Sequence, residues 1–107
     1  PEGLERVAAL SARRTRELVA ALTRVKGVRR CFEGPHFHEA VLTLDRPVSG
    51  VLRELAARGV LGGYDLTEHY PELGAALLVC ATETKTAADV DAYAAALSEA
   101  LRAARAA

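Results

Sequence analysis

The 107-residue chain has a formal net charge of zero, a hydrophobic fraction of 50% and a charged fraction of 26%. This composition is typical of one small globular domain and excludes a disordered chain or a strongly basic nucleic-acid binder. We therefore expect residues 1–107 to form a single domain. The charge is unevenly spread, because residues 1–30 carry eight Arg or Lys against three Glu.

The distribution of apolar residues and cysteines indicates the compartment. The longest apolar run, Ala75 to Ala81, is far shorter than the roughly 20 residues that span a membrane. Cys31 and Cys80 lie far apart in apolar stretches, where reduced thiols are more typical than a disulfide. We expect a cytoplasmic protein and, since the sequence begins with Pro1 rather than Met, a part of a longer one.

The first predicted element is a long helix from Leu4 to Val25, ended by Gly27. One stripe of positions recurs along it at alternating steps of four and three residues. These positions are Leu4, Ala8, Ser11, Thr15, Leu18, Leu22 and Val25. Because only Ser11 and Thr15 occupy the middle of the stripe, we expect the middle turns to lie outside the domain's own core and to be a docking face.

Two strands and a second helix are predicted next. Val28 to Phe32 is expected to form a short strand, and Glu39 to Leu44 alternates in the manner of a strand. The break at Gly34-Pro35 between them favours a hairpin. Pro47 suits the first turn of the following helix, and Gly59 suits its left-handed end. The inner stripe of this helix is Val48, Val51, Leu52 and Leu55.

The next segment contains two strands of different character. Val60-Leu61 is predicted as a brief strand ended by Gly62 and Gly63, and Tyr64 to Gly74 as an irregular surface segment. The run Leu77 to Ala81 is apolar at every position, as expected of a central strand covered on both faces.

The last predicted element is a helix that starts at Thr86. Asp89, three residues later, completes a capping-box-like start. The apolar stripe of this helix is Val90, Tyr93, Ala94, Leu97 and Leu101. The order helix, strand, strand, helix, short strand, strand, helix predicts an α+β fold, in which a small, mostly antiparallel sheet is covered by helices.

The candidates for a metal or nucleophilic site are few. Cys31, His36 and His38 are close in sequence, and imidazole is a common metal ligand. A structural zinc site needs four ligands, and Cys80 and His69 have no paired spacing that would supply the others. We therefore expect no metal site and no catalytic residue, since no spacing singles out a nucleophile with its base or an acid/base pair.

Two further surface features have a functional and a structural interpretation. Gly62-Gly63 can form a backbone nest for an anion, yet no phosphate-loop pattern accompanies it, so an isolated turn is favoured. The arginine-rich first helix can face a nucleic acid, but aromatic residues make up only 5%, which favours a solvated or interdomain face. We expect neither a nucleic acid nor a membrane as partner.

Three stretches together resemble a known family: Gly59-Val60-Leu61-Gly62-Gly63-Tyr64-Asp65-Leu66, Tyr70-Pro71-Glu72-Leu73 and Leu77-Leu78-Val79-Cys80-Ala81-Thr82-Glu83. They are similar to the C-terminal small domain of subunit 1 of the decarboxylating glycine dehydrogenase, the P protein of the glycine cleavage system. The similarity extends from about Leu4 to Arg102. It implies the α+β small domain of pyridoxal phosphate enzymes of the aspartate aminotransferase class (fold type I).

The resemblance also implies an activity for the assembled enzyme. Glycine loses carbon dioxide with pyridoxal phosphate as electron sink, and the aminomethyl group passes to the lipoyl arm of the H protein. The family places the cofactor-bearing lysine on the partner subunit, glycine dehydrogenase subunit 2. Lys26 and Lys85 here are expected to be surface charges, so this chain alone is expected to bind no cofactor and to be inactive.

The role that the resemblance leaves for this chain is architectural, through packing on its own large domain and on the cleft between subunits. The candidates for cleft or interface positions are Gly62, Gly63, Tyr64, Asp65, Thr82 and Glu83. A second hypothesis is a free-standing interaction or regulatory module that kept the shape of such a domain without its catalytic part. The native mass distinguishes the two hypotheses.

Overall fold

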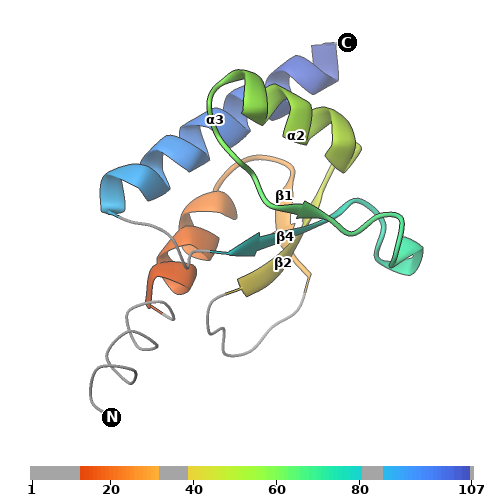
Figure 1. Ribbon diagram of the computed structural model, residues 1–107, viewed down its shortest axis with the longest axis horizontal. Helices are drawn as coiled ribbons and strands as arrows, with labels where there is room; N and C mark the ends of the chain where they lie inside the picture. Colours follow the sequence, from red (N-terminus) through yellow and green to blue (C-terminus); the bar gives the residue numbers. More distant parts are fainter. Residues whose placement is uncertain (1–12, 32–38, 81–85, 107) are drawn as a thin grey trace.

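The computed structural model describes residues 13–31, 39–80 and 86–106, with only the backbone of Glu39 and Cys80. A helix over residues 13–22 is followed by strands β1 (Val28–Arg30) and β2 (Glu39–Leu44) and helix α2 (Val48–Ala57). Strand β3 (Tyr64–Asp65), the 3₁₀ turn η1 (Pro71–Leu73), strand β4 (Ala76–Cys80) and helix α3 (Ala87–Ala106) complete the described chain (Figure 1). The predicted α+β class is thus confirmed, and the order of the elements agrees with the prediction except that the short strand lies at Tyr64–Asp65.

The four strands form one antiparallel sheet in the order β1-β2-β4-β3. Its register pairs Leu42 with Leu77 and Ala40 with Val79, and all four side chains are buried. Because side chains alternate across a strand, these residues lie on one face of the sheet and Val41 and Leu78 lie on the other.

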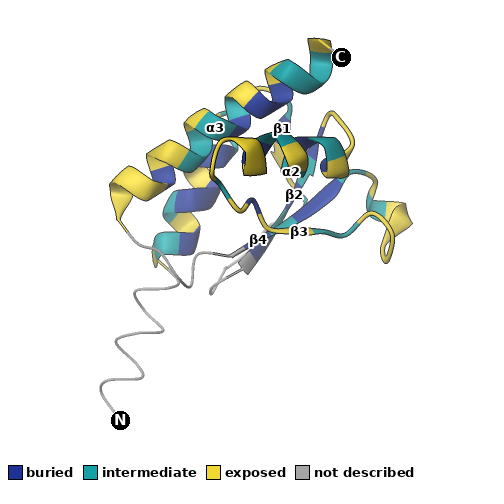
Figure 2. Ribbon diagram, turned by 45° about the horizontal axis from the view of Figure 1, so that its top comes forward, coloured by how far each residue is buried: buried dark blue, intermediate teal, exposed yellow. Residues whose placement is uncertain are grey.

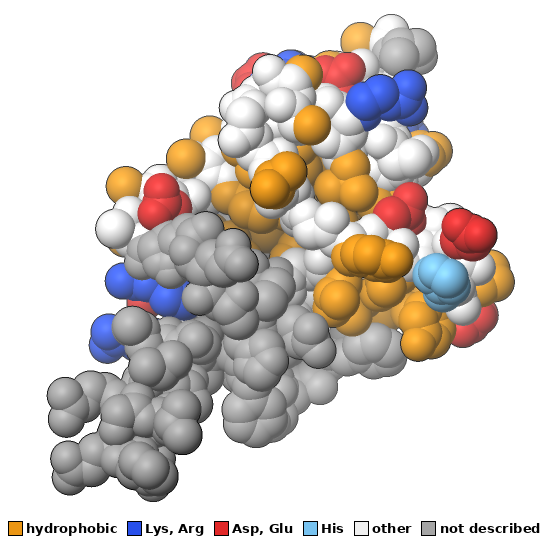
Figure 3. All heavy atoms as spheres, in the orientation of Figure 1, with side chains coloured by type: hydrophobic (Ala, Val, Ile, Leu, Met, Phe, Trp, Pro, Cys, Tyr) orange, Lys and Arg blue, Asp and Glu red, His pale blue; other side chains and the backbone are white. Residues whose placement is uncertain are grey.

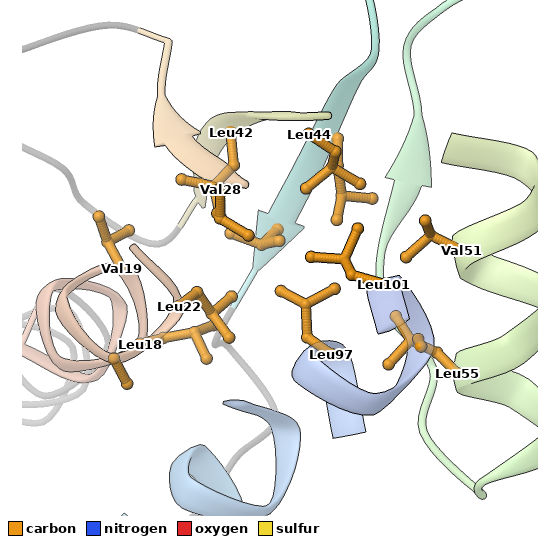
Figure 4. Packing of buried hydrophobic residues seen from close by; sticks show 14 of the residues in the cluster. Leu18, Val19, Leu22, Val28, Leu42, Leu44, Val51, Leu55, Leu97 and Leu101 are labelled. Carbon is orange, nitrogen blue, oxygen red and sulfur yellow. The ribbon is translucent and has the colours of Figure 1, made fainter. Parts of the chain in front are cut away.

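The described helices pack on the same face of the sheet. Side chains of the first helix, α2 and α3 form one apolar cluster with the inward residues of the strands (Figure 4). Fully buried members include Leu22, Leu42, Leu55, Leu77 and Leu97. Exposed residues follow the outer sides of α2 and α3 (Figure 2). The domain is therefore a two-layer arrangement of helices against one side of a sheet.

The ends of the helices follow the sequence signals closely. At the start of α3 the backbone N–H of Thr86 donates to Asp89 Oδ2 (2.9 Å), and the N–H of Asp89 donates to Thr86 Oγ1 (3.3 Å). This is the reciprocal capping box that was predicted. Gly59 adopts φ = 79° after α2, as expected, whereas Pro47 occupies the N-cap of α2 rather than its first turn.

The first helix differs from the prediction in two respects. It ends at residue 22 rather than at Val25, because the N–H groups of Arg24 and Val25 bond to carbonyls three residues back and tighten the last turn. Thr15 is fully buried, since it lies one turn before Leu18 on the side that faces the core. The prediction of an uncovered middle is therefore wrong at Thr15, and Ser11 lies outside the described residues.

The brief strand predicted at Val60-Leu61 is also wrong. The N–H of Val60 donates to Leu55 O (2.9 Å) and so satisfies the end of α2 instead of a strand partner. Leu61 is 93% exposed. The pairing with β4 begins only at Tyr64, in the segment that was expected to be irregular.

Candidate functional site

The glycine pair at the entry to β3 is held by helix α3. Gly62 is buried, and a Cβ atom there would lie 2.5 Å from Cδ1 of Leu55 and 2.8 Å from Cδ2 of Leu52. The hydroxyl of Tyr93 donates a hydrogen bond to the carbonyl oxygen of Gly62. Burial raises the pKa of the Tyr93 phenol far above its ordinary value of 10.0, because the phenolate form is poorly solvated there. Tyr93 is therefore a neutral donor that fixes this backbone.

Gly63 lies directly against the central strand. Its φ of 131° is a conformation that side chains other than hydrogen disfavour. A Cβ atom at this position would collide with the backbone carbonyl oxygen of Leu78. The glycine pair therefore supplies close packing between α2, α3 and β4, and this packing accounts for both glycines without an anion.

Tyr64 and Asp65 follow as the two residues of β3, paired with Leu78 and Leu77. The Tyr64 side chain is 59% exposed. Asp65 Oδ1 accepts a hydrogen bond from the N–H of Thr67 (2.9 Å), which forms an Asx turn after the strand. The Asp65 carboxylate is thus engaged in the local turn.

The segment between β3 and β4 adds exposed apolar surface. Tyr70 is 51% exposed, and its N–H bonds to Leu66 O (2.9 Å) just before η1. Hydrophobic side chains gather around this segment in the space-filling view (Figure 3). Such a surface is typical of contact with another protein segment.

A shallow hollow of about 430 Å³ lies between the start of α2 and the turn after β3. Its polar lining residues are Asp45, Arg46, Ser49, Asp65 and Thr67, and the others are apolar. Of its carboxylates, Asp65 binds the Thr67 N–H and Asp45 pairs with Arg105. Both carboxylates are thus engaged with other groups of the domain, and nothing in this hollow singles out an acid/base pair from them.

The sequence candidates are only partly brought together. Gly62, Gly63, Tyr64 and Asp65 form one continuous edge beside β4, whereas Thr82 and Glu83 lie outside the described residues. His36, His38 and Lys85 also lie outside them.

The metal-site candidates remain scattered where they are described. Cys31 is a half-buried free thiol and His69 is exposed. Over the described residues, no group of three His, Cys, Asp or Glu side chains has the geometry to hold a metal ion. None of the helices in these ranges has the length and apolarity needed to cross a membrane.

Sequence reasoning missed the residues on the second face of the sheet. Val41, Thr43 and Leu78 are half-buried there and are joined at the edge by the exposed Tyr64. The sequence did indicate an apolar second face, because Leu77 to Ala81 is apolar at every position. Val41 is also apolar, although it stands between the polar residues Glu39 and Thr43 at the alternate positions of its strand. The run was interpreted as buried on both faces, but the described helices cover only one of them.

No family model matches the chain. Three curated relatives, each named as probable glycine dehydrogenase (decarboxylating) subunit 1, match nearly all of it. The protein from Nitrosospira multiformis is 55% identical over 95% of this chain, and that from Nitrosomonas europaea is 54% identical over 96%. The protein from Legionella pneumophila is 50% identical over 88% of the chain. The match covers 23%, 23% and 21% of these relatives, so the chain spans about a quarter of their length.

A solved structure gives the same result in three dimensions. The crystal structure of glycine decarboxylase (P-protein) of the glycine cleavage system, in inhibitor-bound form, superposes with a TM-score of 0.86 at 36% identity. The alignment covers 94% of this chain and 23% of that protein. Both comparisons confirm the resemblance that was stated from the sequence. Over nearly its whole length, the chain is homologous to one part of glycine dehydrogenase (decarboxylating) subunit 1.

Proposed function

We propose that this chain is the C-terminal small domain of the subunit of glycine decarboxylase that does not bear pyridoxal phosphate, with a structural and interface role. The observation that carries the proposal is the 55% identity to glycine dehydrogenase subunit 1 over 95% of this chain but 23% of that protein. A match of this extent is expected when a domain is compared with the longer protein that contains it. The small domain would then be inactive alone.

The described side chains support a role in packing rather than in chemistry. Tyr93 and the glycine pair hold the entry to β3, and the carboxylates of Asp45 and Asp65 bind groups of the domain itself. Lys26 is an exposed residue of the turn before β1, a setting that does not suit a Schiff-base lysine, which needs desolvation to become a nucleophile. The setting of Lys26, the lysine among the described residues, supports the proposal that pyridoxal phosphate binds to the partner subunit.

The cofactor and partners of the assembled enzyme are part of the proposal. Pyridoxal phosphate would bind to glycine dehydrogenase subunit 2, and the lipoyl H protein would accept the aminomethyl group. This chain would contact its own large domain and, through the edge at Gly62, Gly63, Tyr64 and Asp65, the cleft between the subunits. Thr82 and Glu83 are proposed at the same cleft from the sequence resemblance.

The first test is the intact mass of the native protein in its source cells, measured after immunoprecipitation with an antibody against this chain. The proposal predicts a species several times heavier than 11.4 kDa, because the relatives are about four times longer. A native species near 11.4 kDa would overturn it and would favour a free-standing interaction module.

The second test is the exchange of labelled carbon dioxide with the glycine carboxyl group. The longer subunit is expected to support exchange only with subunit 2, pyridoxal phosphate and H protein. The 107-residue chain in place of the longer subunit is expected to give none, and its addition to pyridoxal phosphate is expected to leave the cofactor absorbance unchanged. Exchange by this chain alone, or a shifted absorbance band, would contradict the proposed role.

A further inference from the structure

The centre of the loop between α2 and β3 is positioned by groups from other elements. Gly62 and Gly63 carry no side chain that could anchor it. One end of the loop is fixed where the N–H of Val60 bonds to the last turn of α2, and the other end where Tyr64 pairs with β4. Between these two points the Tyr93 hydroxyl donates its hydrogen bond to the carbonyl oxygen of Gly62.

Helix α3 holds the Tyr93 hydroxyl in a defined place. Leu97, Ala100 and Leu101 of this helix are fully buried, and the Tyr93 side chain packs against the same core. A group on a packed helix is positioned more precisely than a group on a loop. The donor is therefore a rigid point to which the loop is attached.

This attachment affects the side chains that the loop presents to its surroundings. Leu61 directly precedes Gly62 and is 93% exposed, and Tyr64 follows two residues later and is 59% exposed. Because peptide units are planar and stiff, a movement of the Gly62 carbonyl also turns the residues beside it. The orientation of this exposed edge is therefore coupled to the hydroxyl of Tyr93.

The proposed function assigns the same edge to the cleft between the subunits. The rate of an enzyme depends on such supporting contacts, because a misplacement of about 1 Å can cost about 100-fold. We infer that Tyr93 is a positioning residue for glycine decarboxylation, which acts through the Gly62 carbonyl on the edge that contains Tyr64 and Asp65. This inference rests on the proposed function and adds to it the residue that sets the edge.

A second polar link on the same helix supplies a matched control. Arg105 donates to Asp45 Oδ2 (2.9 Å), and its place twelve positions after Tyr93 corresponds to about 18 Å along the helix. This link joins α3 to the end of β2 rather than to the loop. Arg105→Ala therefore weakens the attachment of α3 and leaves the contact with Gly62 in place.

Exchange of labelled carbon dioxide with glycine tests the inference in the assembled enzyme. The longer subunit is prepared as the parent, as Tyr93→Phe and as Arg105→Ala, and each is combined with subunit 2, pyridoxal phosphate and H protein. The complex is isolated by size before the assay, so that the rate is obtained per complex. At saturating glycine Tyr93→Phe is expected to exchange about tenfold more slowly than the parent, because the ring remains but the loop loses its attachment. Arg105→Ala is expected to stay within about twofold of the parent, because a distant and independent site does not couple to the edge.

Hydrogen–deuterium exchange of the same complexes measures the loop itself. In Tyr93→Phe the peptide over residues 60–66 is expected to exchange about tenfold faster, since a segment with fewer fixed contacts opens more often. The same peptide in Arg105→Ala is expected to match the parent.

Gly62→Ala is a second variant that acts on the loop from the opposite side. The added Cβ atom meets the ends of the Leu55 and Leu52 side chains, which can move aside while the loop shifts. If both variants act through one loop, the double variant with Tyr93→Phe is expected to lose less activity than the product of the two single losses. Losses that multiply fully would contradict a shared route.

The remaining outcomes each have a defined meaning. Equal carbon dioxide exchange by Tyr93→Phe and the parent overturns the inference, as does an equal loss in Tyr93→Phe and Arg105→Ala, because the hydrogen bond then serves stability alone. A loss of activity without faster deuterium exchange in the loop also overturns it, since the hydroxyl would act by another route. If the parent enzyme itself exchanges no carbon dioxide, the proposed function fails and this inference fails with it.

Discussion

The hydroxyl of Tyr93 in helix α3 is hydrogen-bonded to the carbonyl oxygen of Gly62, 31 positions earlier in the chain. This bond connects the last helix to the loop that leads into β3. Gly62 is buried, so its carbonyl depends on a protein donor rather than on bulk water. The phenol therefore stabilises the edge that contains Tyr64 and Asp65, in addition to the pairing of these two residues with β4.

Tyr93→Phe is expected to lower the free energy of unfolding by about 1–3 kcal/mol, because the carbonyl of Gly62 loses its donor while the ring stays in place. Urea unfolding followed by circular dichroism measures the change. Tyr70→Phe is the matched control. Because Tyr70 is 51% exposed, this substitution is expected to leave the free energy of unfolding almost unchanged. Equal stability of the Tyr93 variant and the parent chain would show that the hydrogen bond contributes nothing.

The same phenol predicts a pH dependence. Its pKa in the folded chain is raised far above the ordinary value of 10.0 by burial, whereas the unfolded chain titrates near that ordinary value. Above about pH 10 the unfolded state releases a proton that the folded state retains. The contribution of this group to the free energy of unfolding is therefore complete below about pH 10, and it falls by about 1.4 kcal/mol per pH unit above that pH. The difference between the parent chain and Tyr93→Phe isolates this group, because all other titrations cancel. A difference that stays constant from about pH 8 to pH 11 would contradict the prediction.

Gly63→Ala is expected to destabilise the chain by about 3 kcal/mol, since it adds strain at a positive φ and a collision with the Leu78 carbonyl. Gly50→Ala is the opposite case. Gly50 lies in α2 with open space around a Cβ atom, and the change is expected to stabilise by about 0.5 kcal/mol through helix propensity. Thermal unfolding of the two variants beside the parent chain measures both changes, a lower melting temperature for Gly63→Ala and a higher one for Gly50→Ala. A Gly63 variant as stable as the parent would show that the loop can move away from β4.

Local sequence signals were sufficient for most of the architecture. The bounds of β2 agree with the predicted Glu39 to Leu44, because the strand has both alternation and clear breaks on each side. The start of α3 agrees because Thr86 and Asp89 satisfy each other's backbone donors within one turn. Signals of this kind act over three or four residues and need no tertiary contact.

The candidate site was less accessible to sequence reasoning. A two-residue strand such as β3 is too short to show a period of two, and the apolar pair Val60-Leu61 gave a stronger but misleading signal. The role of Gly63 depends on its approach to Leu78, fifteen positions later, and that of Gly62 depends on Tyr93. Such contacts follow from the packing of the sheet and are not encoded in any local pattern.

The final prediction concerns the attachment of the end of α3 to the sheet. Arg105 donates to Asp45 Oδ2 from Nη2 (2.9 Å) and Nε (3.2 Å), and Nη2 also donates to the carbonyl of Lys26 (2.8 Å). The three groups come from α3, the end of β2 and the turn before β1. The guanidinium therefore joins three segments that are distant in sequence.

Arg105→Ala is expected to cost about 1 kcal/mol, since the pair is partly exposed and water screens much of its attraction. A double-mutant cycle with Asp45→Asn is expected to give a coupling of about 0.5–1 kcal/mol that falls as salt is added. Arg102→Ala is the matched control on the same helix. Its pair with Glu99 has exposed fractions of 72% and 53%, and such a pair is expected to contribute little. Zero coupling between Arg105 and Asp45 at low salt would show that α3 is held by its apolar face alone.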